Sequence, residues 1–241
     1  AEYTPVSNVK YNLKAIVYDT EGNTYERIGA VTATNPRSTY KGEIELPGTV
    51  EAENFDKGGE GATFHDTNSA DEGKTGYRND GGVDIVTGNG GHALGYTANG
   101  EWLEYTIDVK ETGIYSYDAY VSSGASSASF SLSVETDGKT EELTEVTAIP
   151  QTGNGNWDKY VAVHGRTLVS LSEGKHILRL NITGDNGNID KFVFKHIDPN
   201  NDLKLTLTSD PKVGTINESA TLMATNTSEN TQSVSFYVNN Q

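Results

Sequence analysis

Two glutamates separated by one residue are the first group in this sequence with the types and spacing for chemistry. Glu51 and Glu53 lie in the run 50–55, which is typical of an extended strand. Residues two apart on a strand share a face, so the two carboxylates repel each other unless a cation lies between them. Ca²⁺ takes about six to eight oxygen ligands, and Asp190 from a second strand would add one. A solvated acidic edge explains the spacing equally well.

Combinations of residues that would indicate an enzyme are missing or badly spaced. The Gly-Lys-Thr run at 73–75 matches the end of a phosphate-binding loop, but Asn68 stands where that loop requires glycine. Glu101 and Glu104 are an odd number of residues apart on a predicted strand, so they face opposite sides and do not form a glycosidase pair. No Gly-x-Ser-x-Gly motif occurs, and the histidines show no metal-binding spacing. We therefore expect no catalytic residues.

The sequence predicts short strands separated by turns, so strands and turns must position the side chains of any functional site in this chain. In the long middle stretch, 47–198, turns are predicted at Asn-Gly, Asp-Gly and Glu-Gly pairs, which accept the positive φ that tight hairpins require. Strands at this spacing favour an all-β sandwich. The expected strands are 50–55, 83–86, 102–109, 114–121, 130–134, 160–163, 167–171, 176–182 and 192–197.

The two ends of the chain differ from this middle stretch. Residues 1–40 contain two expected strands, 11–18 and 27–34, followed by a linker. Residues 199–241 contain three more, at 203–208, 220–224 and 234–238. Each end has too few strands for a two-sheet core, so each is predicted to be part of an immunoglobulin-like domain. Either the two parts complement each other, within a chain or between copies, or they belong to two different domains.

Composition narrows the possible partners. The formal net charge of −16 opposes a phosphate backbone, which argues against nucleic acid. No apolar run is long enough to span a bilayer, and no leader segment is evident at the start. The absence of cysteine excludes disulfides and thiolate metal sites, and it suits a bacterial protein that is secreted or displayed on the cell surface.

Five separated motifs occur in an order that is similar to family 6 carbohydrate-binding modules. The resemblance extends over residues 47–197 and is more specific than any single motif. The motifs are Val-Glu-Ala-Glu-Asn-Phe at 50–55, His-Asp-Thr at 65–67, Tyr-Arg at 77–78 with Gly-Val-Asp-Ile at 82–85, Gly-Glu-Trp-Leu-Glu-Tyr at 100–105, and Asn-Ile-Asp at 188–190.

This resemblance implies a β-jelly-roll sandwich with a sugar site among the loops at one end. A Tyr, a Trp and an Asn form that site in the family, and they match Tyr77, Trp157 and Asn188 here. The chemistry of these residues agrees, because aromatic rings pack on the C–H faces of a pyranose while an amide bonds its hydroxyls.

The resemblance also implies a structural calcium ion. Its carboxylate ligands match Glu51, Glu53 and Asp190, and a carbonyl from the loop 72–75 is expected to add to them. Trp102 resembles a buried tryptophan of the family's sandwich, so we expect it in the core. Some relatives bind sugar on the concave face of a sheet as well; residues that would line such a face here are Tyr96, Glu104, Tyr115, Tyr117 and Tyr120.

The function implied is non-catalytic binding of a polysaccharide, which targets an appended glycoside hydrolase in the same polypeptide to its substrate. The ligand is expected to be a β-linked polysaccharide, with β-1,3-glucan or agar-type galactan ranked ahead of xylan. A structural or adhesion spacer of a cell-surface protein is the alternative.

Overall fold

The computed structural model describes residues 10–32, 37–79, 81–198, 205–210 and 221–226. The chain divides into two units, Ala1–Lys195 and His196–Gln241. Within the described residues the one helical element is a short 3₁₀ turn, η1, at Ala52–Asn54. No helix in this part of the chain is long and apolar enough to cross a membrane.

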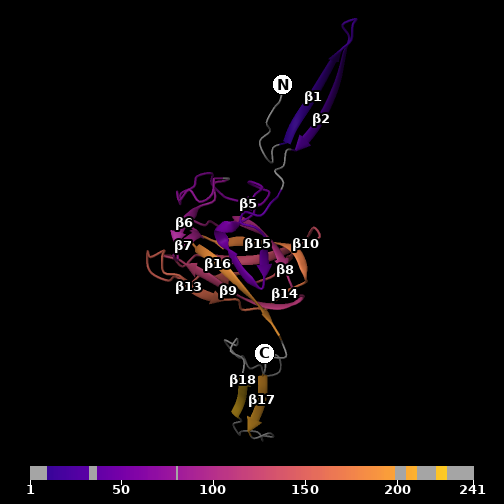
Figure 1. Cartoon of the computed structure of the whole chain (residues 1–241). Helices are drawn as coiled ribbons and strands as arrows, with labels where there is room; N and C mark the ends of the chain where they lie inside the picture. The colour runs from indigo at the N-terminus through magenta and orange to yellow at the C-terminus, as the bar shows by residue number, and fades with distance from the viewer. Residues whose placement is uncertain (1–9, 33–36, 80, 199–204, 211–220, 227–241) are drawn as a thin grey trace, which may run out of the picture. The chain divides into compact units, whose positions relative to one another are not determined.

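The first unit contains a sandwich of two seven-stranded sheets, many of whose strands are labelled in Figure 1. The first sheet has the order β11-β10-β15-β8-β3, with β12 paired to β10 and β5 paired to β8. Its strands are β3 (Ile44–Leu46), β5 (Phe64–His65), β8 (Trp102–Val109), β10 (Ser129–Thr136), β11 (Lys139–Glu142), β12 (Thr147–Ala148) and β15 (Gly174–Gly184).

The second sheet has the order β13-β9-β16-β7-β6, with β14 paired to β9 and β4 paired to β16. Its strands are β4 (Gly48–Glu51), β6 (Ile85–Gly88), β7 (Gly91–Leu94), β9 (Gly113–Ser122), β13 (Val161–His164), β14 (Val169–Leu171) and β16 (Asn188–Ile197). Nearly all pairs in the two sheets are antiparallel, and the pair of β3 with β8 is parallel.

Alternation of side chains along the strands explains why the two sheets pack together. On β8, Leu103, Tyr105 and Ile107 are buried in the core, while the residues between them face the other side of the sheet. On β16, Phe192 and Phe194 are buried in the same way. Each such side chain stabilises the fold by about 2 kcal/mol through removal of apolar surface from water. The prediction of an all-β jelly-roll sandwich is confirmed.

The hairpin between β10 and β11 shows how local sequence sets register. Asp137 and Gly138 both have positive φ, at 51° and 77°, and they form a two-residue loop between the paired residues Thr136 and Lys139. Such a turn requires positive φ at both central positions, which Asp and Gly tolerate better than other residues. The predicted turn at this position is therefore confirmed.

Two local predictions were wrong. The run 50–55 is not one strand, because the chain leaves the sheet after Glu51 and enters η1, whose Ala52 carbonyl accepts a hydrogen bond from the Tyr105 hydroxyl at 2.8 Å. The argument that Glu51 and Glu53 share a strand face therefore fails. Trp102 is not in the core either, because it lies on the outward face of β8 with the Arg179 guanidinium 4.1 Å from its ring centre.

The described residues at the two ends form separate two-stranded hairpins. Near the N-terminus, β1 (Lys10–Tyr18) pairs with β2 (Thr24–Thr32), and near the C-terminus β17 (Leu205–Asp210) pairs with β18 (Thr221–Asn226). The predicted strand at 234–238 lies outside the described residues. An immunoglobulin-like origin for these hairpins stays a prediction.

Residues 37–46 pack on the sandwich through more than the pairing of β3. Ser38 exchanges backbone hydrogen bonds with Lys57, and the Tyr40 hydroxyl donates to the Tyr77 carbonyl at 2.9 Å. The Arg37 guanidinium donates to the Asp56 carboxylate at 3.1 Å.

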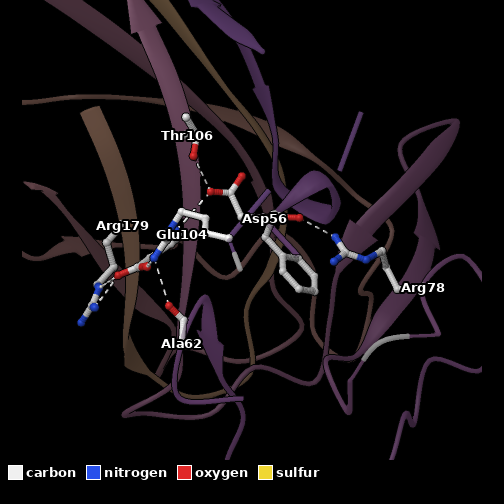
Figure 2. Close-up of polar contacts among 8 residues, drawn as sticks. Asp56, Ala62, Arg78, Glu104, Thr106 and Arg179 are labelled. Atoms are coloured by element: carbon white, nitrogen blue, oxygen red, sulfur yellow. Dashed lines mark hydrogen bonds and ion pairs between the residues drawn. The ribbon is translucent and has the colours of Figure 1, made fainter. Parts of the chain in front are cut away.

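Two carboxylates on the outward side of the first sheet are nearly fully buried and depend on these contacts. Figure 2 shows Glu104 between Arg179 and the group formed by Asp56 and Thr106. The Arg179 Nε donates to Glu104 at 2.7 Å, and Arg37 pairs with both Glu104 and Asp56. A buried carboxylate without a cation would cost several kcal/mol, so the two arginines allow these charges to remain inside.

Replacement of Arg37 by alanine is expected to lower the free energy of unfolding by about 1–2 kcal/mol, because it leaves Asp56 without its cation while Glu104 keeps Arg179. Urea denaturation measures this change. Lys175→Ala is the control, since it breaks an exposed ion pair with Glu43 and should have little measurable effect. Equal losses in the two variants would contradict a special role for Arg37.

Candidate functional site

A pocket of about 310 Å³ lies at one end of the second sheet. Its walls come from β6, from the residues after β7, from the loop before β13, and from the turn between β15 and β16. The lining residues are Val86, Thr87, Tyr96, Trp157, Asp158, Asn186 and Asn188. Loops at the ends of packed strands are a common place for binding sites, because the scaffold holds them while their side chains stay accessible.

Trp157 is exposed in its loop yet held firmly by its backbone. Its carbonyl accepts hydrogen bonds from the Asn188 side-chain amide at 3.0 Å and from the Ser122 hydroxyl at 2.7 Å. Its ring rests on Gly124, where an added Cβ would come within 2.8 Å of the indole. The side chain is 39% exposed, so the protein supports the ring without covering it.

Tyr96 is the second aromatic residue of the pocket and is 56% exposed. It follows β7 and adopts a left-handed φ of 50°, which is uncommon for a residue with a bulky side chain. The pairing of Ile189 with Leu94 places Asn188 beside Gly95, whose added Cβ would lie 3.3 Å from the Asn188 side-chain oxygen. The sheet therefore holds Tyr96 and Asn188 at the same end.

The structure brings together two of the three residues that the sequence assigned to the sugar site. Trp157 and Asn188 line the pocket, and Tyr77 does not. Tyr77 instead stacks on His92 with ring centres 4.2 Å apart, and its hydroxyl donates to Asn54 at 2.7 Å. It packs against the core and is not among the residues that line the pocket.

Tyr96 was the pocket residue that sequence reasoning missed. The prediction that Tyr96 lies on a sheet face is wrong, and the sequence contains a signal against it. Tyr96 follows Gly95 and precedes the Asn99-Gly100 turn pair, so it belongs to a connection and not to a strand. A residue in a connection at the end of a strand is free to line a site at that end.

The alternative surface on a sheet face is not assembled from the residues expected there. Tyr115 and Tyr117 are buried in the core, and Tyr120 lies on the second sheet with Lys191 over its ring. Glu104 is held by Arg37 and by Arg179, the second of which is labelled in Figure 2. These side chains serve packing and internal ion pairing.

The three carboxylates predicted to bind calcium lie near one another without forming a closed metal cage. Within the described ranges, no group of three or more His, Asp or Glu side chains is placed to hold a metal ion. Glu53 is nevertheless buried, and its Oε2 has no hydrogen-bond partner. Burial, with repulsion from Glu51 and Asp190, raises the pKa of Glu53 to about 7. An orphaned, buried carboxylate oxygen beside two further carboxylates fits the oxygen chemistry that Ca²⁺ prefers.

A second acidic group consists of three residues from the sequence motifs and lies near the end of β7. Asp66, Asp84 and Glu101 surround a cavity of about 10 Å³. Burial, together with Glu101, Asp84 and Glu60, raises the pKa of Asp66 to about 7. Burial and neighbouring acids likewise raise the pKa of Asp84 to about 6. Because Asp66 holds its proton to higher pH in the folded state than in the unfolded one, its contribution to stability falls as pH rises from about 4 to 7.

The fold and the pocket together define a β-sandwich with a pocket lined by exposed aromatic side chains at its loop end. The family model of carbohydrate binding module family 6 matches residues 74–196, which is half of the chain. The protein belongs to this family of carbohydrate-binding modules. It is accordingly a binding module and not an enzyme.

Curated relatives with known names are both agarases. The chain is 29% identical over 133 residues to the β-agarase AgaO of Microbulbifer thermotolerans, covering 54% of this chain and 11% of that protein. It is 26% identical over 123 residues to an α-agarase of Thalassotalea agarivorans, covering 49% of this chain and 8% of that protein. The chain therefore spans only about a tenth of the length of these relatives.

Solved structures with a similar fold include other family 6 modules. The C-terminal module of the laminarinase LamC from Zobellia galactanivorans is 23% identical, with a TM-score of 0.45 over 61% of this chain and 97% of that chain. A β-1,3-glucan-binding module from Bacillus halodurans is 18% identical, with a TM-score of 0.46 over 64% of this chain and 99% of that chain.

Asp66→Asn is expected to raise the free energy of unfolding at pH 8 by on the order of 1 kcal/mol and to leave it unchanged at pH 4, because it removes a half-buried charge that exists only at high pH. Urea denaturation in chelator at both pH values measures the effect. Glu142→Gln, on the exposed strand β11, makes the same change in net charge and should give no comparable gain. A loss of stability at pH 8 would contradict the prediction.

Proposed function

We propose that the pocket between Tyr96 and Trp157 is the saccharide site of this module. The observation that carries the proposal is a pair of exposed aromatic side chains around a hollow whose base is a buried amide, Asn188. Core packing does not require such exposure. Each ring would stack on a C–H face of a pyranose and contribute on the order of 1 kcal/mol, while the polar groups of the pocket orient the hydroxyls.

The shape of the pocket favours one sugar residue over a long stretch of chain. A hollow of about 310 Å³ has the size of a small-ligand site and is bounded by loops on several sides. A chain end, or a sugar exposed by the shape of the polymer, would therefore enter more readily than the interior of an extended chain.

The proposed ligand is a β-linked polysaccharide, with an agar-type galactan first, β-1,3-glucan next and xylan behind them. The names of the two curated relatives, both agarases, support this order. We further propose that the module targets a glycoside hydrolase domain in the same polypeptide to its substrate, in a bacterial protein that is secreted or displayed on the cell surface. Polymeric substrate outside the cell would be the target of such an arrangement.

Calcium is proposed as a structural ligand of the module at Glu51, Glu53 and Asp190. The buried, unpartnered oxygen of Glu53 and the mutual repulsion of the three carboxylates support this assignment. Asp190 also accepts a hydrogen bond from Asn89 at 2.7 Å, which holds its side chain in place. A bound divalent cation would relieve the repulsion and add its binding free energy to the stability of the fold.

Trp157→Ala and Tyr96→Ala are each expected to weaken binding to agarose or laminarin at least about tenfold, because each removes one stacking wall. Calorimetry with soluble oligosaccharides measures the change. Tyr77→Ala is the matched comparison: it should lower the melting temperature through lost packing while the folded protein keeps its affinity. Severe loss of affinity in Tyr77→Ala, with full affinity in Tyr96→Ala, would favour the sequence-based assignment instead.

Chelation is expected to lower the melting temperature by several degrees, and added Ca²⁺ to restore it, because a ligand that binds only the folded state stabilises it by mass action. Calorimetric melting curves measure the shift. Glu53→Gln should lose most of this response, whereas Glu45→Gln, an exposed change of the same charge, should keep it. If neither chelator nor Ca²⁺ changes the melting temperature of the wild-type protein, the calcium assignment is wrong.

A further inference from the structure

The sugar pocket has a negative charge at its rim. Asp158 is the one charged residue among the described residues that line it, and no lysine or arginine is among them. Its side chain is exposed, and within the described part of the chain no ion pair is formed by its carboxylate. Asp158 follows Trp157 directly in the chain, and both residues line the pocket.

The loop around Asp158 is held in a defined position. The Asp158 backbone N–H donates to the Asn156 side chain at 3.0 Å, and the Asn156 N–H donates to the Gly153 carbonyl. With the Trp157 carbonyl bonded to Ser122 and Asn188, three successive residues of the loop are hydrogen-bonded to fixed partners. The backbone that carries Asp158 is therefore held in place beside the pocket.

The amide groups of the pocket add hydrogen-bond acceptors to this charge. The Asn188 nitrogen already donates to the Trp157 carbonyl at 3.0 Å, and the Asn186 nitrogen lies 3.4 Å from the Ser127 hydroxyl. Their side-chain oxygens, like the two oxygens of Asp158, are hydrogen-bond acceptors. Free sugar hydroxyls supply such donors, whereas a sulfate ester or a carboxylate supplies none.

We propose that Asp158 makes this pocket selective for neutral sugar residues with free hydroxyls, and against residues that carry a sulfate ester or a carboxylate. A neutral residue donates its hydroxyls to the carboxylate in charge-assisted hydrogen bonds. An anionic residue places like charges close together in a partly desolvated site, with no basic residue in the pocket lining to offset the repulsion. This inference rests on the proposed function and adds the class of polysaccharide that the site accepts.

The test compares neutral and anionic polysaccharides of related structure. Calorimetry with agarose oligosaccharides and with oligosaccharides of a sulfated galactan, at low and high NaCl, gives an affinity ratio for each protein. The wild type is expected to bind the sulfated ligand at least about tenfold more weakly at low salt, and Asp158→Asn to reduce this ratio to about threefold or less. Asparagine keeps one acceptor oxygen but removes the charge.

Glu142→Gln is the matched control, because it makes the same change in net charge on β11, outside the residues that line the pocket. A ratio that changes equally in both variants would overturn the proposal, since the chain's overall charge would then explain the selectivity. Equal binding of both ligands by the wild type, lost in Trp157→Ala, would overturn the charge filter and leave the proposed function standing. Wild-type protein that binds neither ligand, nor laminarin, would overturn the proposed function itself.

Discussion

Packing of two sheets through their apolar faces is the interaction on which the rest of this module depends. It requires strands whose side chains alternate, as Leu103, Tyr105 and Ile107 do on β8, and it places every connection at an end or an edge of the sandwich. Some side chains in the connections can therefore stay exposed. Trp157 and Tyr96 are able to remain exposed because buried side chains elsewhere already hold the loops that carry them.

Packing of the sheets also buries carboxylates, which lose their contact with water. The module contains two different arrangements of such buried carboxylates. Glu104 and Asp56 have protein cations, since Arg37 and Arg179 lie against them. Glu53 has no hydrogen-bond partner for its buried Oε2. In the first arrangement, arginine side chains of the protein itself balance the buried charges and cover part of a sheet face. In the second arrangement, the unpartnered oxygen of Glu53 suits a bound cation. Carboxylates paired with arginine are therefore structural, whereas Glu53 is a candidate for binding a metal ion.

The position of the pocket between Tyr96 and Trp157 follows from strand pairing. Because β7 and β16 are neighbours, the residues that follow one strand lie beside the residues that begin the other, and Tyr96 is thereby brought near Asn188. Asn188 then bonds the Trp157 carbonyl, which joins a third loop to the same end of the sheet. One buried amide thus serves both as the base of the pocket and as a support for its stacking wall.

Local sequence determined the strands, the Asp137-Gly138 hairpin and the family to which the chain belongs, because side-chain alternation, turn chemistry and ordered motifs are properties of short segments. It also indicated Trp157 and Asn188. Tertiary structure decided which tyrosine stands in the pocket, that the chain turns away from the sheet after Glu51, and that Trp102 faces outward against Arg179. These outcomes depend on which strands become neighbours and on which side of a sheet is covered. Both depend on contacts between residues far apart in the chain. The spacing of residues within a short segment carries no information about such contacts.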